Sequence, residues 1–196
     1  MPATNDTRSK MVTSAALLIR ESGVGGTSFA KVLVHSKSPR GSIGHHFPGG
    51  KSEMVKDAIS WAGDKATEMM RNEVGSGAST QDVFVLVAGL YRDALINSDY
   101  AAGCPIGVAA QESHQEEEIR KAIQRVFDDW RNILQTQLIK EGRSANESRD
   151  LAQLAVASVE GALLIARIDQ DSGPVDSIIR QITPLLSANS STPAGR

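Results

Sequence analysis

Apolar residues recur every three or four positions along most of the chain, which is the pattern of helices that bury one face. Residues 6–22, for example, place Val12, Ala15 and Ile19 on one side of a helix with 3.6 residues per turn. Residues 116–141 carry a wider apolar stripe. No segment shows a convincing strand pattern, and no internal repeat is found. The pattern therefore predicts an all-α protein of about nine to ten helices.

Capping residues, glycines and prolines mark where these helices begin and end. Gly23, Gly25 and Gly26 end the first helix. Pro39 stands at the first position of the third helix, where its missing N–H costs nothing. The expected helices cover residues 6–22, 28–34, 39–46, 51–73, 80–98, 108–113, 116–141, 146–168 and 174–185.

Three short helices within about 47 residues, with a tight turn between the second and the third, are typical of a helix-turn-helix. In that motif the third helix enters the major groove of DNA. A plain three-helix bundle is the alternative. We expect a DNA-binding domain over residues 1–50 and a helical regulatory and dimerisation domain over 51–187. Helix 51–73 connects the two, and the Ser/Thr/Pro/Gly-rich residues 188–196 are expected to form a disordered tail.

The distribution of charge supports a nucleic-acid partner. Residues 1–56 carry eight basic and three acidic side chains, a net charge of +5, whereas the rest of the chain carries thirteen basic and twenty acidic ones. The formal charge of −2 for the whole chain conceals this asymmetry. A basic N-terminal part on an acidic body indicates that the N-terminal part meets a polyanion, with chance asymmetry as the alternative.

The stretch TSFAKVLVHSKSPRGSIGHHFPGGK, residues 27–51, resembles the signature of the tetracycline-repressor (TetR) family of bacterial transcription regulators. Residues 39–51 and the later AGCPIG, residues 102–107, resemble its LmrA-like subgroup. The resemblance implies that Ile43 and Phe47 seat the recognition helix on the first two helices. It also implies a set of DNA contacts and helix-terminal phosphate contacts: Thr27, Ser28, Ser38, Pro39, Arg40, Gly41, Ser42, Gly44, His45 and Lys51.

One position departs from the family pattern. The family usually has a tyrosine where this chain has Gly44, and that tyrosine commonly contacts the DNA backbone. Glycine removes the contact and weakens the recognition helix by up to about 1 kcal/mol. We therefore keep a second hypothesis, a small-molecule-binding or interaction protein whose DNA-reading head is weakened.

Readers of the major groove typically act as symmetric dimers, because two recognition helices must meet two half-sites. The best interface candidate is helix 146–168, whose small residues allow close approach of helices; the resemblance implies that the last two helices form a four-helix bundle between two subunits. The candidate interface residues are Leu151, Leu154, Ala155, Ser158, Ala162 and Leu163.

The resemblance also implies a small-molecule pocket in the C-terminal domain, and a repressor that its ligand releases from the operator. The candidate lining residues are Leu86, Leu90, Cys104, Ile106, Phe127 and Trp130, each of which could equally be an ordinary core residue. Few charges occur among them, so an apolar or aromatic inducer is expected. The expected partners are double-stranded operator DNA, this inducer and a second copy of the chain.

Other classes of function find little support in the sequence. No run of about 20 apolar residues is present, so no membrane-spanning segment is expected. A polar N-terminus and the lone Cys104 favour a cytoplasmic protein. Residues 49–52, GGKS, lack the spacing and the preceding strand of a phosphate-binding loop. No catalytic set and no metal-ligand spacing stand out, so we expect no cofactor, no metal and no enzymatic activity.

Overall fold

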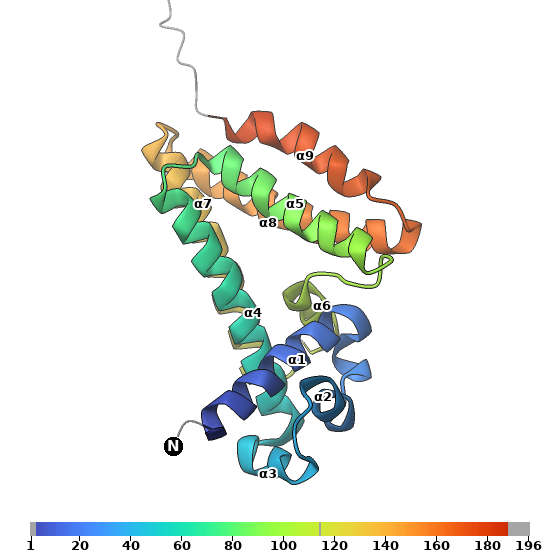
Figure 1. Ribbon diagram of the computed structural model, residues 1–196. Coiled ribbons are helices and arrows are strands. Elements are labelled where there is room, and N and C mark those ends of the chain that lie inside the picture. Colours follow the sequence, from blue (N-terminus) through green and yellow to red (C-terminus); the bar gives the residue numbers. More distant parts are fainter. Residues whose placement is uncertain (1–2, 114, 188–196) are drawn as a thin grey trace, which may run out of the picture.

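The computed structural model describes residues 3–113 and 115–187, and helices dominate these ranges (Figure 1). The predicted all-α fold is confirmed. The helices are α1 (Ala3–Gly26), α2 (Phe29–Ser36), the 3₁₀ turn η1 (Arg40–Ser42), α3 (Ile43–His46), α4 (Gly50–Gly75), α5 (Thr80–Asn97), α6 (Pro105–Glu112), α7 (Glu117–Lys140), α8 (Ala145–Asp169) and α9 (Gly173–Leu186). The expected tail, 188–196, lies outside the described residues.

Most boundaries lie within a few residues of the expected ones, because the capping residues act as the sequence indicates. Ser79 and Asp82 form a capping box at the start of α5, in which each side chain bonds the other residue's backbone N–H. α6 differs: it begins at Pro105, three residues before its expected start, with the proline in its first turn. The third helix also differs, since its first turn is the separate 3₁₀ turn η1.

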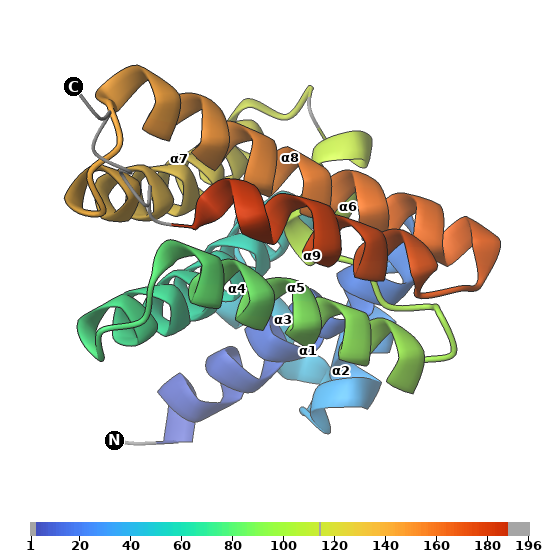
Figure 2. The same cartoon turned by 90° about the horizontal axis from the view of Figure 1, so that it is seen from above.

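The molecule has a small head, α1 to α3, and a larger body, α5 to α9 (Figure 1). α4 runs from one to the other: it packs on α1 near the head and along α7 in the body. Seen from above, α9 lies beside α8 and α5, which it contacts on both sides (Figure 2). α6 lies against α1, so the head is joined to the body by both α4 and α6.

The end of α1 is bent where α6 meets it. Gly23 has a φ of +74°, in the left-handed region that favours glycine. The carboxylate of Glu112, at the end of α6, accepts a hydrogen bond of 2.7 Å from the N–H of Gly25. A Cβ on residue 23 would lie 2.9 Å from Cδ of Glu112 and closer still to Oε1. Glycine at 23 therefore provides both the bend and the room for this contact.

α8 is long and apolar enough to cross a membrane by length and composition alone. The expectation that the chain has no membrane-spanning segment rested on the absence of an uninterrupted apolar run, and it stays a prediction. In the structure α8 packs between α7 and α9, and its buried face includes Ala155, Ala162 and Leu163. Its apolar content serves this bundle on one face and remains exposed on the other.

Candidate functional site

The recognition segment is one 3₁₀ turn, η1, followed by the four-residue helix α3 at the tip of the head (Figure 1). Ser28 caps α2 by accepting a hydrogen bond from the N–H of Lys31, and Lys37 ends α2 in the left-handed conformation. Most of the predicted DNA contacts face solvent here. Pro39, Arg40, Gly41, Gly44 and His45 are exposed, as is Ser28, and Ser38, Ser42 and Lys51 are partly exposed.

Thr27 is the exception among the predicted DNA contacts. Its side chain is completely buried, and its hydroxyl donates a 2.8 Å hydrogen bond to the carbonyl of Gly23. It therefore stabilises the bend between α1 and α2 and cannot place its side chain on DNA. The predicted contact of Thr27 with DNA is therefore wrong. The family pattern puts this position at an exposed helix terminus, whereas here the bend at the end of α1 buries the side chain.

Three cations point outward from this face of the head. Lys37 and Arg40 are exposed and Lys51 is partly exposed. Within residues 3–113 and 115–187 none of the three forms an ion pair, whereas Lys10 is paired with Asp6 at 2.6 Å. Unpaired cations are available to phosphate groups or to guanine edges. Lys37 was absent from the sequence prediction.

Arg8 fixes the recognition segment to the rest of the head. Its Nη2 lies 3.2 Å from Oε1 of Glu53 and also contacts the carboxylate of Asp57 on α4. Its Nε donates a 3.2 Å hydrogen bond to the carbonyl of His46, and its guanidinium lies 5.0 Å from the centre of the Phe47 ring. We call these five residues the Arg8 cluster. Sequence reasoning missed it, because the partners lie 38 to 49 positions away from Arg8.

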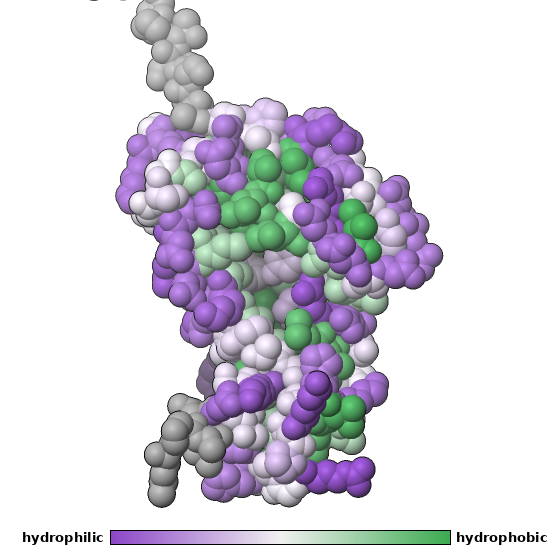
Figure 3. Space-filling view, in the orientation of Figure 1, coloured by the Kyte–Doolittle hydropathy of each residue, from purple (hydrophilic) through white to green (hydrophobic). Residues whose placement is uncertain are grey.

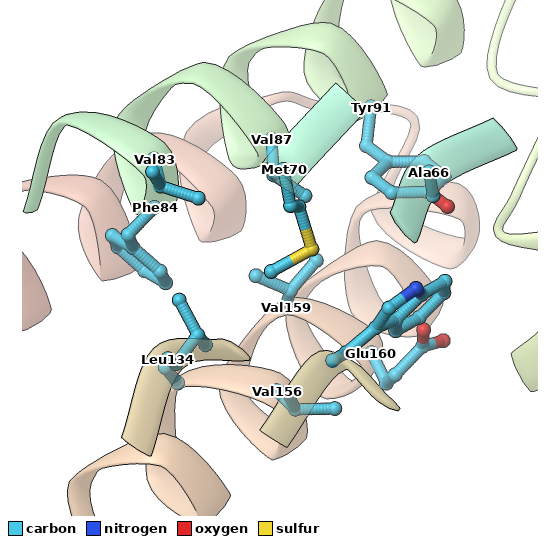
Figure 4. A pocket seen from close by; sticks show the side chains of 12 residues that line it. Ala66, Met70, Val83, Phe84, Val87, Tyr91, Leu134, Val156, Val159 and Glu160 are labelled. Carbon is cyan, nitrogen blue, oxygen red and sulfur yellow. The ribbon is translucent and has the colours of Figure 1, made fainter. Parts of the chain in front are cut away.

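The body contains an apolar pocket between α4, α5, α7 and α8 (Figure 4). Its volume is about 30 Å³, enough for one or two water molecules. It is lined by Ala66, Met70, Val83, Phe84, Val87, Tyr91, Trp130, Leu134, Ala155, Val156, Val159 and Glu160.

Of the predicted lining residues, Trp130 alone lines this pocket. Leu90 is exposed, and Leu86 lies on the same side of α5, because α5 turns its Val83–Val87–Tyr91 face to the pocket. Phe127 packs edge-to-face on Trp130, with 5.7 Å between the ring centres, and does not itself line the pocket. Cys104 and Ile106 are buried core residues. Five of the six predictions are therefore corrected.

A group of polar side chains lies at one end of the pocket. In Figure 4 the hydroxyl of Tyr91 and the carboxyl of Glu160 lie at the same side, opposite Val83, Phe84 and Leu134. The thiol of Cys104 lies 3.5 Å from the Tyr91 hydroxyl. Burial raises the pKa of Glu160 to about 7, while the adjacent Cys104 thiol acts in the opposite direction. Burial, with the Glu160 charge, raises the pKa of Cys104 well above its usual value, so this thiol stays protonated.

The surface of the body is apolar along the outer face of α8. Leu164 is 48% exposed, Ile165 52% and Ile168 78%. With small neighbours they form a continuous row, here called the α8 stripe: Leu154, Ala157, Ser158, Gly161, Leu164, Ile165 and Ile168. Figure 3 shows further apolar side chains gathered on the face of the body that α5 and α9 form.

The α8 stripe revises the predicted interface. Leu154 and Ser158 lie on it, and Leu151 is partly buried. Ala155, Ala162 and Leu163 are buried inside the chain at 1%, 5% and 2% exposure, so a second chain cannot reach them. The prediction chose the apolar side of α8 that packs on the body, because both sides of this helix are apolar.

The comparisons with known proteins cover both head and body. Residues 81–181 match the family described as "Transcriptional regulator LmrA/YxaF-like, C-terminal domain". An uncharacterized HTH-type transcriptional regulator of Mycobacterium tuberculosis is 38% identical over 187 residues, 92% of this chain and 94% of the relative. The HTH-type transcriptional regulator LmrA of Bacillus subtilis is 26% identical over 186 residues, covering 92% and 97%. A TetR transcriptional regulator from Legionella pneumophila superposes with a TM-score of 0.82 at 23% identity, covering 91% of this chain and 96% of that chain.

Proposed function

Because this chain belongs to the LmrA/YxaF-like group of TetR-family DNA-binding transcriptional regulators, we propose that it is a dimeric repressor which a small molecule releases from its operator. The observation that carries the proposal is the exposed recognition segment, whose Arg40 forms no ion pair with the residues that the structure describes. In this proposal the exposed Arg40 pairs with guanine O6 and N7, a contact worth roughly 1–3 kcal/mol of discrimination between bases. Lys37 and Lys51 supply attraction to phosphates that does not depend on sequence.

The dimer rests on the α8 stripe. Small residues in its centre, Ser158 and Gly161, allow a second helix to approach closely, while Leu164, Ile165 and Ile168 supply apolar area. A row of exposed large apolar side chains is unusual on the surface of a monomer and marks an interaction site. A symmetric pairing gives the dimer two recognition segments, one from each chain, as two half-sites require.

Release by a ligand rests on α4, which joins the pocket to the head. Ala66 and Met70, in its second half, line the pocket, and Glu53 and Asp57, near its start, hold Arg8. A ligand that needs more room than the pocket offers displaces α4 and therefore the recognition segment. Its effect is limited to the difference between its affinities for the two conformations.

DNA binding is tested by fluorescence anisotropy with the DNA upstream of the gene and with genomic fragments selected by the protein. We expect specific binding by the wild type and loss of sequence preference in Arg40→Ala. Lys51→Ala should weaken binding to all sequences and lower the salt slope by about one. Lys10→Ala, which removes a cation paired with Asp6, is the matched control. Absence of selected fragments, or unchanged preference in Arg40→Ala, would contradict the proposal.

Gly44 favours a second candidate function. It is exposed with nothing within 4 Å of a Cβ placed there, so the recognition segment presents bare backbone at its centre. A protein that binds a small molecule but has lost operator affinity would show ligand binding in calorimetry and no DNA binding at low salt. In that case Gly44→Tyr should restore measurable DNA binding.

A further inference from the structure

We propose that the pocket selects an amphipathic organic cation, a molecule with an apolar ring-containing body and a protonated amine that pairs with Glu160. This inference rests on the proposed function, since it names the class of ligand that would act at the same pocket. It adds a positive charge to the apolar or aromatic inducer that the sequence favours, because Glu160 was not among the residues expected in the pocket.

The first reason is that Glu160 is the one charged side chain among the residues that line this pocket in the described part of the chain. The other walls are aliphatic, aromatic or thioether groups, and the Tyr91 hydroxyl is the other polar side-chain group on the same side. The inner surface of the pocket is almost wholly apolar, because the Glu160 carboxyl is turned toward Gly107 of α6. Once the pocket widens, that carboxyl is the charged group within reach of a ligand, and it can orient the ligand while the walls hold the rest by apolar contact.

The second reason is that Glu160 has no ion-pair partner within the described ranges. The groups against it are the Cys104 thiol and the Tyr91 hydroxyl, and the positive charge of Arg20 acts on Tyr91 rather than on Glu160. A buried carboxylate without a counter-ion is unfavourable unless a positive charge reaches it. A ligand amine supplies that charge together with N–H donors, whereas an alcohol or phenol supplies a donor alone.

The third reason is the aromatic lining. Phe84, Tyr91 and Trp130 all face the pocket, and aromatic faces attract desolvated cations. The indole Nε1 of Trp130 is buried and has no hydrogen-bond partner in the described structure. A buried donor of this kind gains by meeting an acceptor. A hydrogen-bond acceptor on the ligand would therefore add to its affinity, separately from the charge of the amine.

The position of Glu160 also explains how binding of such a cation would change contacts outside the pocket. Its carboxyl lies against Gly107 of α6, where a Cβ would come within 3.0 Å of Cδ of Glu160. α6 ends at Glu112, which holds the N–H of Gly25 in the head. A ligand that draws the carboxyl toward the pocket therefore acts on the helix that contacts α1. The pocket must also widen, and the flexible Met70 side chain is suited to move.

The test compares two probes of nearly equal shape, 4-tert-butylbenzylamine, which is protonated at neutral pH, and 4-tert-butylbenzyl alcohol. Their affinities for the full chain are measured by calorimetry without DNA. We expect the wild type to bind the amine at least tenfold more tightly than the alcohol. In Glu160→Gln this preference should fall to about twofold or less with alcohol binding unchanged. Glu68→Gln, an exposed glutamate of α4, is the matched control and should keep the preference.

Equal affinities in the wild type, absence of amine binding at millimolar concentration, or a preference that survives in Glu160→Gln would overturn the proposal. If Glu160→Gln does not fold, Gly107→Ala serves as the second variant, because its Cβ displaces the carboxyl without removing it and should reduce the preference. Adding each probe to the operator complex separates the two proposals. Selective amine binding that leaves the complex intact supports the ligand class and refutes release, whereas release by the alcohol alone supports release and refutes the ligand class.

Discussion

Replacing Gly63 by alanine should destabilise the protein, although alanine is the better helix former. Gly63 is buried in the middle of α4 where this helix crosses α7. A Cβ there would lie 2.8 Å from Cγ1 of Val126 and closer to Cγ2. Two carbon atoms pack at about 3.5–4.0 Å, so either the helices must separate or Val126 must move. Val126 is completely buried, and a valine in a helix has one strongly preferred rotamer, so it cannot turn away cheaply.

The magnitude follows from two opposing effects. Alanine gains about 1 kcal/mol of helix propensity over glycine. Overpacking a close contact typically costs about 1–3 kcal/mol, and the rigid neighbour at this crossing places the cost in the upper part of that range. We therefore expect a net loss of about 1–2 kcal/mol in the free energy of unfolding. In a chain of this length that loss lowers the melting temperature by about 2–8 °C.

The assay is thermal and urea unfolding followed by circular dichroism at a fixed protein concentration, since the proposed dimer would make stability depend on concentration. Gly89→Ala in the middle of α5 is the matched control, because nothing lies within 4 Å of its added Cβ and it should stabilise by up to about 1 kcal/mol. Val126→Ala should partly rescue Gly63→Ala, with a coupling of at least about 1 kcal/mol. A Gly63→Ala protein as stable as the Gly89→Ala protein, or additive effects in the double variant, would refute the reasoning.

Three further outcomes are expected. Arg8→Ala, which removes the centre of the Arg8 cluster, should weaken operator binding at least tenfold, whereas Lys10→Ala should change it less than twofold; equal effects in anisotropy would contradict the positioning role. Burial raises the pKa of Glu160 to about 7 from 4.5, so the folded protein holds the proton of this carboxyl more tightly than the unfolded chain does. The resulting contribution to the free energy of unfolding is complete below about pH 4.5 and is lost as the pH rises through 7. The difference in unfolding free energy between wild type and Glu160→Gln should thus change by up to about 3 kcal/mol between pH 4.5 and 8, and a constant difference in urea titrations would refute it. Ile165→Glu should convert the dimer to monomers in analytical ultracentrifugation while Ile139→Glu, at an exposed site of α7, should not; two dimeric variants would exclude the α8 stripe.

The sequence was sufficient for the helices and for the head, because both depend on local signals. Caps such as Ser28 and Ser79, and the apolar period of 3.6 residues, act within a few positions of one another. The recognition segment could also be located from the sequence, because the motif that marks it is contiguous along the chain. Which side of an apolar helix faces inward depends on partners far along the chain. Both α5 and α8 are apolar on two sides. Leu86 and Leu90 were therefore expected in the pocket although they lie on the other side of α5. For the same reason the expected interface mixed Leu154 and Ser158, which lie on the α8 stripe, with buried residues such as Ala155.

Contacts between distant residues carried no signal in the sequence. In the sequence Arg8 and Glu160 look like ordinary charged residues of helices. Only the fold brings Arg8 to the recognition segment and Glu160 against Gly107 of α6. One sign of Glu160 was available in the sequence: it lies three positions before the apolar Leu163, on the same side of the helix, and Leu163 is buried. Arg8 offered no comparable indication.

The bend at Gly23 has a consequence for how this protein has diverged from its relatives. The Glu112 carboxylate occupies the volume that any larger residue at 23 would need, and it satisfies a backbone N–H that only this bend exposes. Homologues that lose the glycine should therefore also lose the glutamate, so positions 23 and 112 should change together across an alignment although they lie 89 positions apart.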